Sequence, residues 1–265
     1  MTVLQALLLG ALQGVTEFLP VSSSGHLVLS RGILGLEEIP ILFDVLLHVS
    51  TLIVVLIVFR GPIRALLVSL GRFLGRKHTS EDSVNLKLIL IIIAATVPTV
   101  LLGLGISFLE MESHPKIVAV LFMITGGVLI GSHYMHGKKQ YGEIGVKEGV
   151  IAGIAQGLGV FPGISRSGIT ISAALFAGLD RKKAGEFSFL IAIPAIVGAF
   201  IFELKDVGEL MAQVNPAPLA AGIVSSFVVG LVSLLLLLRL VRGGKLYLFS
   251  LYLIPLGIIS LILLP

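Results

Sequence analysis

The sequence predicts an all-α integral membrane protein with six transmembrane helices and two re-entrant helix–loop–helix hairpins, arranged as an inverted-topology repeat. Of the 265 residues, 56% are hydrophobic and only 13% are charged, and the mean hydropathy is +1.07. Apolar runs of about 18 residues or more recur, each long enough to cross the hydrocarbon layer as a helix. A polar stretch is also duplicated. No run remains for a soluble domain, so residues 1–265 read as a single membrane domain.

The duplicated stretch runs from Gln13 to His26 and reappears from Gln156 to Gly168. It brings a carboxylate, hydroxyls and an imidazole into an apolar chain, and ionisable groups flanked by hydrocarbon mark a functional site. We therefore divide the chain into two repeats, 1–135 and 146–265. Seven residues of the first repeat recur 143 positions later: Gln13 as Gln156, Gly14 as Gly157, Ser22 as Ser165, Ser24 as Ser167, Gly25 as Gly168, Gly35 as Gly178 and Leu36 as Leu179.

Each repeat reads as a hairpin followed by three spans. Half-length apolar pieces on both sides of a polar turn are too short to cross the bilayer, so each pair is expected to dip in and return. Ile63–Leu74 carries arginines at helical spacing and is expected to lie in the interface. The half-length pieces are Thr2–Leu12, Leu27–Leu36, Val150–Val160 and Thr170–Leu179. The spans are Ile41–Phe59, Leu86–Leu109, Ile117–Tyr134, Phe187–Phe202, Leu219–Leu238 and Leu246–Leu264.

The parity of these elements and the distribution of charge predict the topology. A re-entrant hairpin returns to its own side while three spans change sides, so the second hairpin enters from the opposite face and the two tips meet near the midplane. The positive-inside rule puts 15 of the 19 Lys and Arg in the cytoplasm, leaving only Lys116 and Lys205 outside and Arg31 and Arg166 in the hairpins. Both termini are then outside. Topology thus explains the net charge of +4 better than nucleic-acid binding does.

The two turns have the chemistry of an anion site. Ser22 or Ser23 is a natural N-cap for the returning half-helix, whose free N–H groups attract anions. In the second turn Arg166 stands where Ser23 stands in the first, and its fork suits two phosphate oxygens. A diphosphate therefore fits better than a carboxylate. The residues expected to bind it are Gln13, Ser22, Ser24, Gly25, Ser165, Ser167, Gly168 and Thr170.

Glu17, Ser23, Ser24 and His26 distinguish a catalyst from a simple binder. Gln13 and Glu17 share one helix face, and Glu17 with Gln13 could hold Mg²⁺ or Ca²⁺ together with substrate phosphates. Without metal, Glu17 would act as a base for a hydroxyl or water. Ser23 is our first choice of nucleophile and His26 of acid–base partner, and the reverse assignment stays open.

Four residues have competing structural interpretations. Arg166 could pair with Glu17 or extend to the interface instead of binding substrate, and His26 could be a satisfied polar core residue. Asp44 and His48 share a face of the first span, but no phosphate-binding pattern accompanies them. For these two, a structural or rim role is as well supported as a role in the site.

The two turns resemble the signature motifs of the undecaprenyl-diphosphate phosphatase family, the integral membrane enzymes linked to bacitracin resistance. The matching stretches are Gln13-x-x-x-Glu17 with Pro20-Val-Ser-Ser-Ser-Gly-His26, and Pro162-Gly-Ile-Ser-Arg-Ser-Gly-Ile-Thr170. The resemblance implies removal of the terminal phosphate of undecaprenyl diphosphate at the outer face of the cytoplasmic membrane, with a divalent cation. It makes Glu17, Ser23, His26 and Arg166 the essential residues. Gln13 occupies a position that is Glu or Gln in the family, leaving one carboxylate for a metal.

A second class of function is compatible with the same plan. Inverted repeats with broken helices are common in secondary transporters, so a lipid-phosphate flippase or an anion carrier is the alternative. Glu17 with His26 favours hydrolysis, because a simple phosphate carrier needs neither. The expected partners are a polyprenyl diphosphate and membrane lipids, and the sequence leaves open whether the chain is a monomer or a homodimer.

Overall fold

The chain is helical throughout the part that the computed structural model describes, which is residues 1–27, 41–109, 114–203 and 215–263. Within these ranges the one β feature is an isolated bridge between Lys139 and Leu179. The α-helices are α1 (Val3–Phe18), α3 (Ile41–Val58), α4 (Arg60–Leu74), α5 (Ser83–Ser107), α6 (Pro115–His133), α7 (Val146–Leu158), α8 (Arg166–Phe176), α9 (Arg181–Glu203), α11 (Pro216–Arg242) and α12 (Ser250–Leu263). Short 3-10 turns η1, η3 and η5 span Ser80–Asp82, Tyr141–Glu143 and Leu246–Phe249.

Five helices are long and apolar enough to cross a membrane, namely α5, α6, α9, α11 and α12 with its preceding turn. The bent pair α3 and α4 makes a sixth candidate, with a 76° angle at the break between them. The multi-pass helical class predicted from hydropathy is therefore confirmed. The predicted Leu27–Leu36 piece lies almost wholly outside the described residues.

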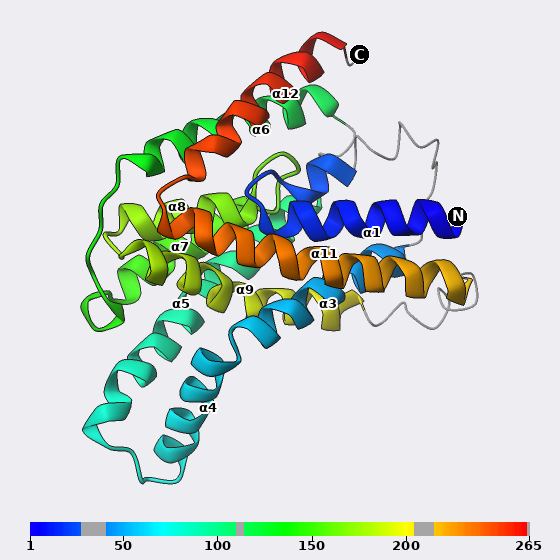
Figure 1. The fold of residues 1–265 in the computed structure, drawn as a ribbon. Coiled ribbons are helices and arrows are strands. Elements are labelled where there is room, and N and C mark those ends of the chain that lie inside the picture. The colour runs from blue at the N-terminus through cyan, green and yellow to red at the C-terminus, as the bar shows by residue number, and fades with distance from the viewer. Residues whose placement is uncertain (28–40, 110–113, 204–214, 264–265) are drawn as a thin grey trace.

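The helices connect at two ends of the molecule (Figure 1). One end of the molecule holds both termini. On this side lie the first residues of α1 and α3 and the last residues of α5, α9 and α12. The α4–α5, α6–α7, α8–α9 and α11–α12 connections lie toward the other end. Helix α1 runs inward from the first end and α7 from the second. The sequence predicted a half-length apolar piece, Thr2–Leu12. Helix α1 is longer than this piece, because Gln13–Phe18 are also helical.

Glycines bring each of these inward helices against a long span. On α7, a Cβ added at Gly149 would lie 2.7 Å from the Ile91 oxygen of α5. On α1, a Cβ added at Gly14 would lie 2.7 Å from the Gly230 nitrogen of α11. Small residues at i and i+4 allow this close approach, which is the usual way that helices associate in a bilayer. The backbone contacts fix where the C-terminal ends of α1 and α7 lie.

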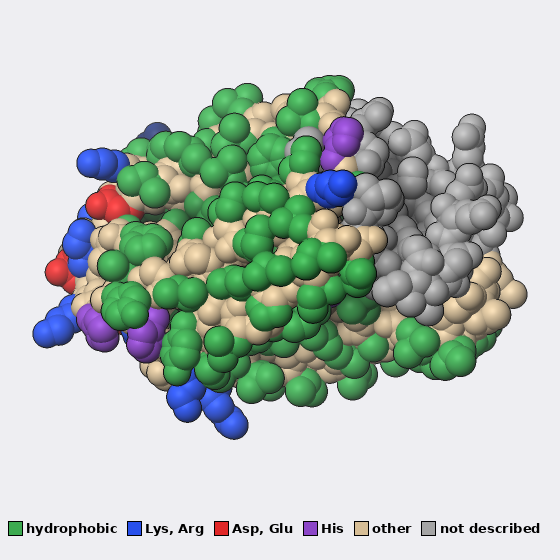
Figure 2. Space-filling view, turned by 90° about the horizontal axis from the view of Figure 1, so that it is seen from above, with side chains coloured by type: hydrophobic (Ala, Val, Ile, Leu, Met, Phe, Trp, Pro, Cys, Tyr) green, Lys and Arg blue, Asp and Glu red, His purple; other side chains and the backbone are tan. Residues whose placement is uncertain are grey.

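The surface has the pattern of a membrane protein. Hydrophobic side chains cover the middle of the face in Figure 2, and the visible charged side chains gather mainly at the left end. Exposed apolar residues such as Leu90, Val232 and Leu251 point outward from the long helices. Packed inside, Phe18, Phe122 and Phe187 belong to one buried cluster that joins the inward helices to the spans around them.

Candidate active site

Two serine-rich tips, far apart in the sequence, touch each other in the interior. The Gly163 N–H donates to Ser22 Oγ at 2.9 Å, and Gly25 is so close that an added Cβ would lie 2.9 Å from the Gly163 nitrogen. Thr125 of α6 stabilises the second tip with two hydrogen bonds: its hydroxyl donates to the Gly163 oxygen at 3.0 Å and accepts from the Ser165 N–H at 3.2 Å. Gly163 has φ +96°, which glycine adopts without strain. The predicted meeting of the two tips is therefore observed.

Both tips end in a capped helical turn of the same design. Ser22 Oγ accepts from the Gly25 N–H at 3.4 Å, and Ser165 Oγ accepts from the Gly168 N–H at 3.1 Å. Between the two predicted cap residues of the first tip, the structure selects Ser22. Its φ is +70°, a conformation that non-glycine residues adopt mainly where the surroundings enforce it. The cap leaves Ser23 to face Glu17.

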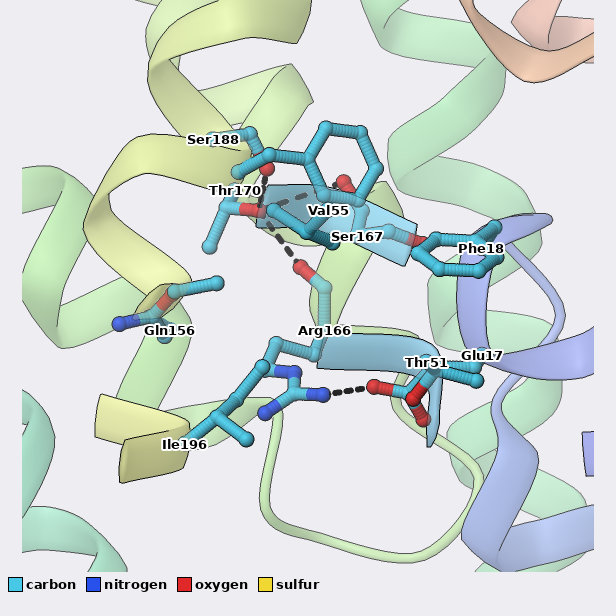
Figure 3. Close-up of a pocket in the computed structure, with 12 residues that line it drawn as sticks. Glu17, Phe18, Thr51, Val55, Gln156, Arg166, Ser167, Thr170, Ser188 and Ile196 are labelled. Carbon is cyan, nitrogen blue, oxygen red and sulfur yellow. Dashed lines mark hydrogen bonds and ion pairs between the residues drawn. The ribbon is translucent and has the colours of Figure 1, made fainter. Parts of the chain in front are cut away.

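Glu17 is the centre of a polar cluster between the tips, and its side chain is 6% exposed. One carboxylate oxygen pairs with the Arg166 guanidinium of α8 (Figure 3). The other accepts from Ser23 Oγ at 2.9 Å and from Gln13 Nε2 at 3.1 Å, and it lies 3.6 Å from His48 Nε2. The pairing of Arg166 with Glu17, which the sequence left as an alternative, is thus present.

A cavity of about 160 Å³ opens beside this cluster. It reaches the first residues of α8, whose N–H groups and dipole attract anions. Its walls include six residues predicted for catalysis or binding, namely Glu17, Ser22, Ser23, Ser24, Ser165 and Arg166, and also Thr16, His48, Gly159, Val160 and Ile164. A highly charged anion in this cavity would meet hydroxyls and a guanidinium.

The remaining predicted binding residues lie elsewhere. Ser167 and Thr170 line a second cavity of about 20 Å³ that also touches Glu17 and Arg166, which is room for about one water molecule (Figure 3). Thr170 donates to the Arg166 carbonyl oxygen at 2.7 Å and contacts Ser188. The other three, Gln13, Gly25 and Gly168, line neither cavity. Gly25 and Gly168 support the tips, and Gln13 contacts Glu17 from outside both cavities.

His26 lies outside the cavity. Its Nδ1 is 2.8 Å from the Ser22 carbonyl oxygen and its Nε2 is 2.7 Å from the Tyr252 hydroxyl of α12. Because a carbonyl can only accept, Nδ1 carries a proton. The ring is buried and packs edge-on against Phe122. The structure therefore brings Glu17, Ser23 and Arg166 together but directs His26 to the backbone of the tip.

His48 is the site residue that the sequence left undecided between a rim role and a role in the site. It approaches Glu17 from α3 and lines the 160 Å³ cavity, while its Nδ1 is 2.9 Å from the Asp44 carbonyl oxygen. Its side chain is 38% exposed. The available signal was a pair of ionisable residues on one face of an apolar helix. Nothing in that pattern showed that the face meets α1.

Gln156, the counterpart of Gln13, has a structural position. Its Nε2 donates to Thr99 Oγ1 at 3.2 Å and to the Ile191 oxygen at 3.1 Å, so it joins α7 to α5 and α9. In the second repeat Val160 stands where Glu17 stands in the first, and Arg166 stands where Ser23 stands, so the site is chemically asymmetric.

The donors near Glu17 suit a cation that arrives with a phosphate ligand. Among the described residues no group of three or more His, Asp or Glu side chains could hold a metal. Of the described residues, Glu17 is the only carboxylate lining the 160 Å³ cavity, and among them the buried Gln13 Oε1 has no hydrogen-bond partner. Mg²⁺ commonly takes one or two carboxylates plus substrate phosphates and waters. The residues fit that arrangement.

These observations define a multi-pass helical membrane protein with a buried carboxylate–guanidinium–serine site suited to phosphate chemistry. The chain belongs to the bacitracin resistance protein BacA family, whose model matches residues 6–259. It is 50% identical over 258 residues to an undecaprenyl-diphosphatase of Treponema denticola, covering 97% of this chain and 96% of the relative. Similar proteins with the same name occur in Desulfosudis oleivorans, 43% identical over 270 residues with 97% of both chains covered, and in Borreliella burgdorferi, 40% identical over 257 residues with 97% and 96% covered.

Proposed function

We propose that the chain hydrolyses the terminal phosphate of undecaprenyl diphosphate, giving undecaprenyl phosphate and inorganic phosphate and so recycling the lipid carrier of cell-wall synthesis. The family match and the names of the similar proteins support this reaction. One observation carries the assignment to the cavity: the Ser23 hydroxyl donates to a buried carboxylate that also pairs with Arg166. The flippase or carrier alternative has no support among these relatives.

In the proposed mechanism Arg166 moves from Glu17 to the terminal phosphate, and its fork stabilises the charge that develops there. Ser23 Oγ attacks the terminal phosphorus while its proton passes to Glu17. The bond from phosphorus to the bridging oxygen breaks, and Glu17 gives the proton to the departing undecaprenyl phosphate. Water then attacks the phosphoserine, Glu17 takes one water proton and returns it to the serine oxygen, and inorganic phosphate leaves.

His26 has a positioning role in this scheme, in place of the acid–base role expected from the sequence. The support is its pair of bonds, one to the Ser22 carbonyl and one to Tyr252. By holding Ser22, His26 fixes the backbone that aims Ser23 at Glu17. A divalent cation, Mg²⁺ or Ca²⁺, would be held by Glu17 and Gln13 with diphosphate oxygens, and it would neutralise phosphate charge.

The proposed topology has two re-entrant hairpins inserted from opposite faces of the cytoplasmic membrane. It is supported by the opposite directions of α1 and α7, the contact of their tips and the fixed 143-residue offset (Figure 1). The clustering of charged side chains at one end supports a cytoplasmic α4–α5 connection (Figure 2). Both termini and the entrance of the site are then on the outer face.

Purified protein in detergent is expected to release inorganic phosphate from undecaprenyl diphosphate, with undecaprenyl phosphate as the other product. A carrier needs two compartments and cannot turn over there, so the assay separates the two functions. A chelator is expected to lower the rate, and Mg²⁺ or Ca²⁺ to restore it. Full activity after chelation would contradict the requirement for a divalent cation. No phosphate release under any condition would contradict the assignment of hydrolysis.

Ser23→Ala is expected to lower kcat by at least about 10³-fold, as loss of a covalent nucleophile does. Ser24→Ala, a neighbour on the same tip, should lose far less because Ser24 only lines the cavity. Rapid quenching with substrate labelled in the terminal phosphate should leave label on Ser23. Label on His26, or none on a protein that still turns over, would contradict the assignment.

A further inference from the structure

A third cavity, which the proposed mechanism does not use, lies between α3 and α9. Its volume is about 350 Å³. Its walls are formed by Asp44, Val45, His48, Val49, Arg166, Ile196, Ala199 and Phe200. The α9 members stand at i, i+3 and i+4, and so do Val45, His48 and Val49 on α3, which is the spacing of one helix face. We call this space the α3–α9 groove.

The α3–α9 groove is continuous with the proposed reaction site, because His48 and Arg166 line both the groove and the 160 Å³ cavity. Arg166 is the phosphate-binding cation of the mechanism. Five of the eight groove residues are apolar, whereas the 160 Å³ cavity is rich in hydroxyls. Asp44 puts a carboxylate on the groove wall, which disfavours a phosphate there. That repulsion does not act on an uncharged apolar chain, which can enter the groove while the diphosphate to which it is attached is held by Arg166.

We propose that the α3–α9 groove receives the first isoprene units of the substrate, so that the prenyl chain leaves the site sideways between these two helices. The proposal rests on the proposed function. Helix α9 is a candidate span and α3 belongs to the bent pair, so both walls of the groove are formed by helices of the candidate membrane-crossing set. The charged head can then enter the polar cavity while the tail stays in the bilayer.

The main effect of the groove is to position the substrate, and it adds little to the binding free energy. Lipid tails are as apolar as the groove, so moving a prenyl chain into it gains little hydrophobic free energy. A guided chain instead aligns the terminal phosphorus with Ser23, and small misplacements of reacting groups can cost about 10²-fold in rate. A side chain that fills the groove should therefore reduce turnover of prenyl substrates and leave binding of a bare headgroup unchanged.

Ala199→Trp tests this inference, because Ala199 is an exposed residue that lines the groove and a larger side chain there would occupy part of the groove. For farnesyl and undecaprenyl diphosphate, kcat/KM is expected to fall by about tenfold to a hundredfold. The inhibition constant of inorganic diphosphate, which has a headgroup and no chain, should stay within about twofold. Ile201→Trp is the control, since Ile201 is 59% exposed on α9 and lines neither the α3–α9 groove nor the 160 Å³ cavity.

Photo-crosslinking provides a readout that does not depend on turnover. A prenyl diphosphate with a diazirine on its first isoprene unit should label peptides containing Val45, Val49 or Ile196–Phe200, and Ala199→Trp should lower that label. Unchanged kcat/KM in Ala199→Trp, as expected if a phospholipid chain fills the groove, would overturn the inference. So would label confined to other helices. Failure of the unmodified protein to release phosphate would instead overturn the proposed hydrolysis, so the two failures are distinguishable.

Discussion

Arg166→Lys is expected to lower kcat for phosphate release by about 10³-fold, the lower end of what a transition-state arginine contributes in phosphoryl transfer. Lysine keeps the charge beside Glu17 but loses the planar fork that can hold two phosphate oxygens while the bond breaks. The folded state should survive, because the buried carboxylate still has a cationic partner. Initial rates at saturating substrate, with a thermal melt of the same preparation, measure both effects.

Arg64→Lys is the matched control for this substitution. Arg64 is exposed on α4 and lines an open surface groove far in sequence from either tip, so its replacement should leave kcat within about twofold. A rate for Arg166→Lys within tenfold of the unmodified protein would show that any cation suffices at this position. The bidentate grip in the mechanism would then be wrong.

Gly153→Leu is expected to prevent folding. A Cβ at Gly153 would lie 2.7 Å from the Ala95 Cα of α5, so the two backbones would have to separate before any larger side chain could fit. Forcing extra atoms into a well-packed contact costs about 1–3 kcal/mol for small insertions and more for a leucine. The measurement is the fraction of detergent-extracted protein that elutes as a single monodisperse peak, together with its melting temperature.

Gly127→Leu provides the comparison, because a Cβ added at Gly127 on α6 would meet nothing within 4 Å. This variant should elute like the unmodified protein and melt at least as high, since leucine has a better helix propensity than glycine. Equal behaviour of the two variants would mean that the close contact between α5 and α7 does not hold the fold together.

The spans and the paired tips were predictable from sequence, and their local causes explain why. Hydropathy over about 20 residues is a strong one-dimensional signal for a membrane helix. The offset of 143 residues pointed to Ser22 and Ser165, and both cap their helical turns as the motif requires. Hydropathy and helix capping depend only on neighbours in the chain, whereas the contact of the two tips, 141 positions apart, was predicted from the parity of the repeated elements.

The partners of individual side chains were not predictable in the same way. His26 meets Tyr252, 226 positions away, and His48 meets Glu17 because α3 packs beside α1. Such contacts depend on how helices from different parts of the chain are arranged, which neither periodicity nor composition reports. Arg166 illustrates the limit, since the motif identified it as a phosphate ligand while the structure pairs it with Glu17.

The bond between Glu17 and Arg166 also constrains how the protein is made. Arg166 is translated 149 positions after Glu17, so the carboxylate is in place well before its partner exists. An ionised group surrounded by hydrocarbon is costly until it is neutralised. Until the later half is made, Glu17 has only the Gln13, Ser23 and His48 side chains of its own half as polar partners, and the permanent positive charge reaches it last.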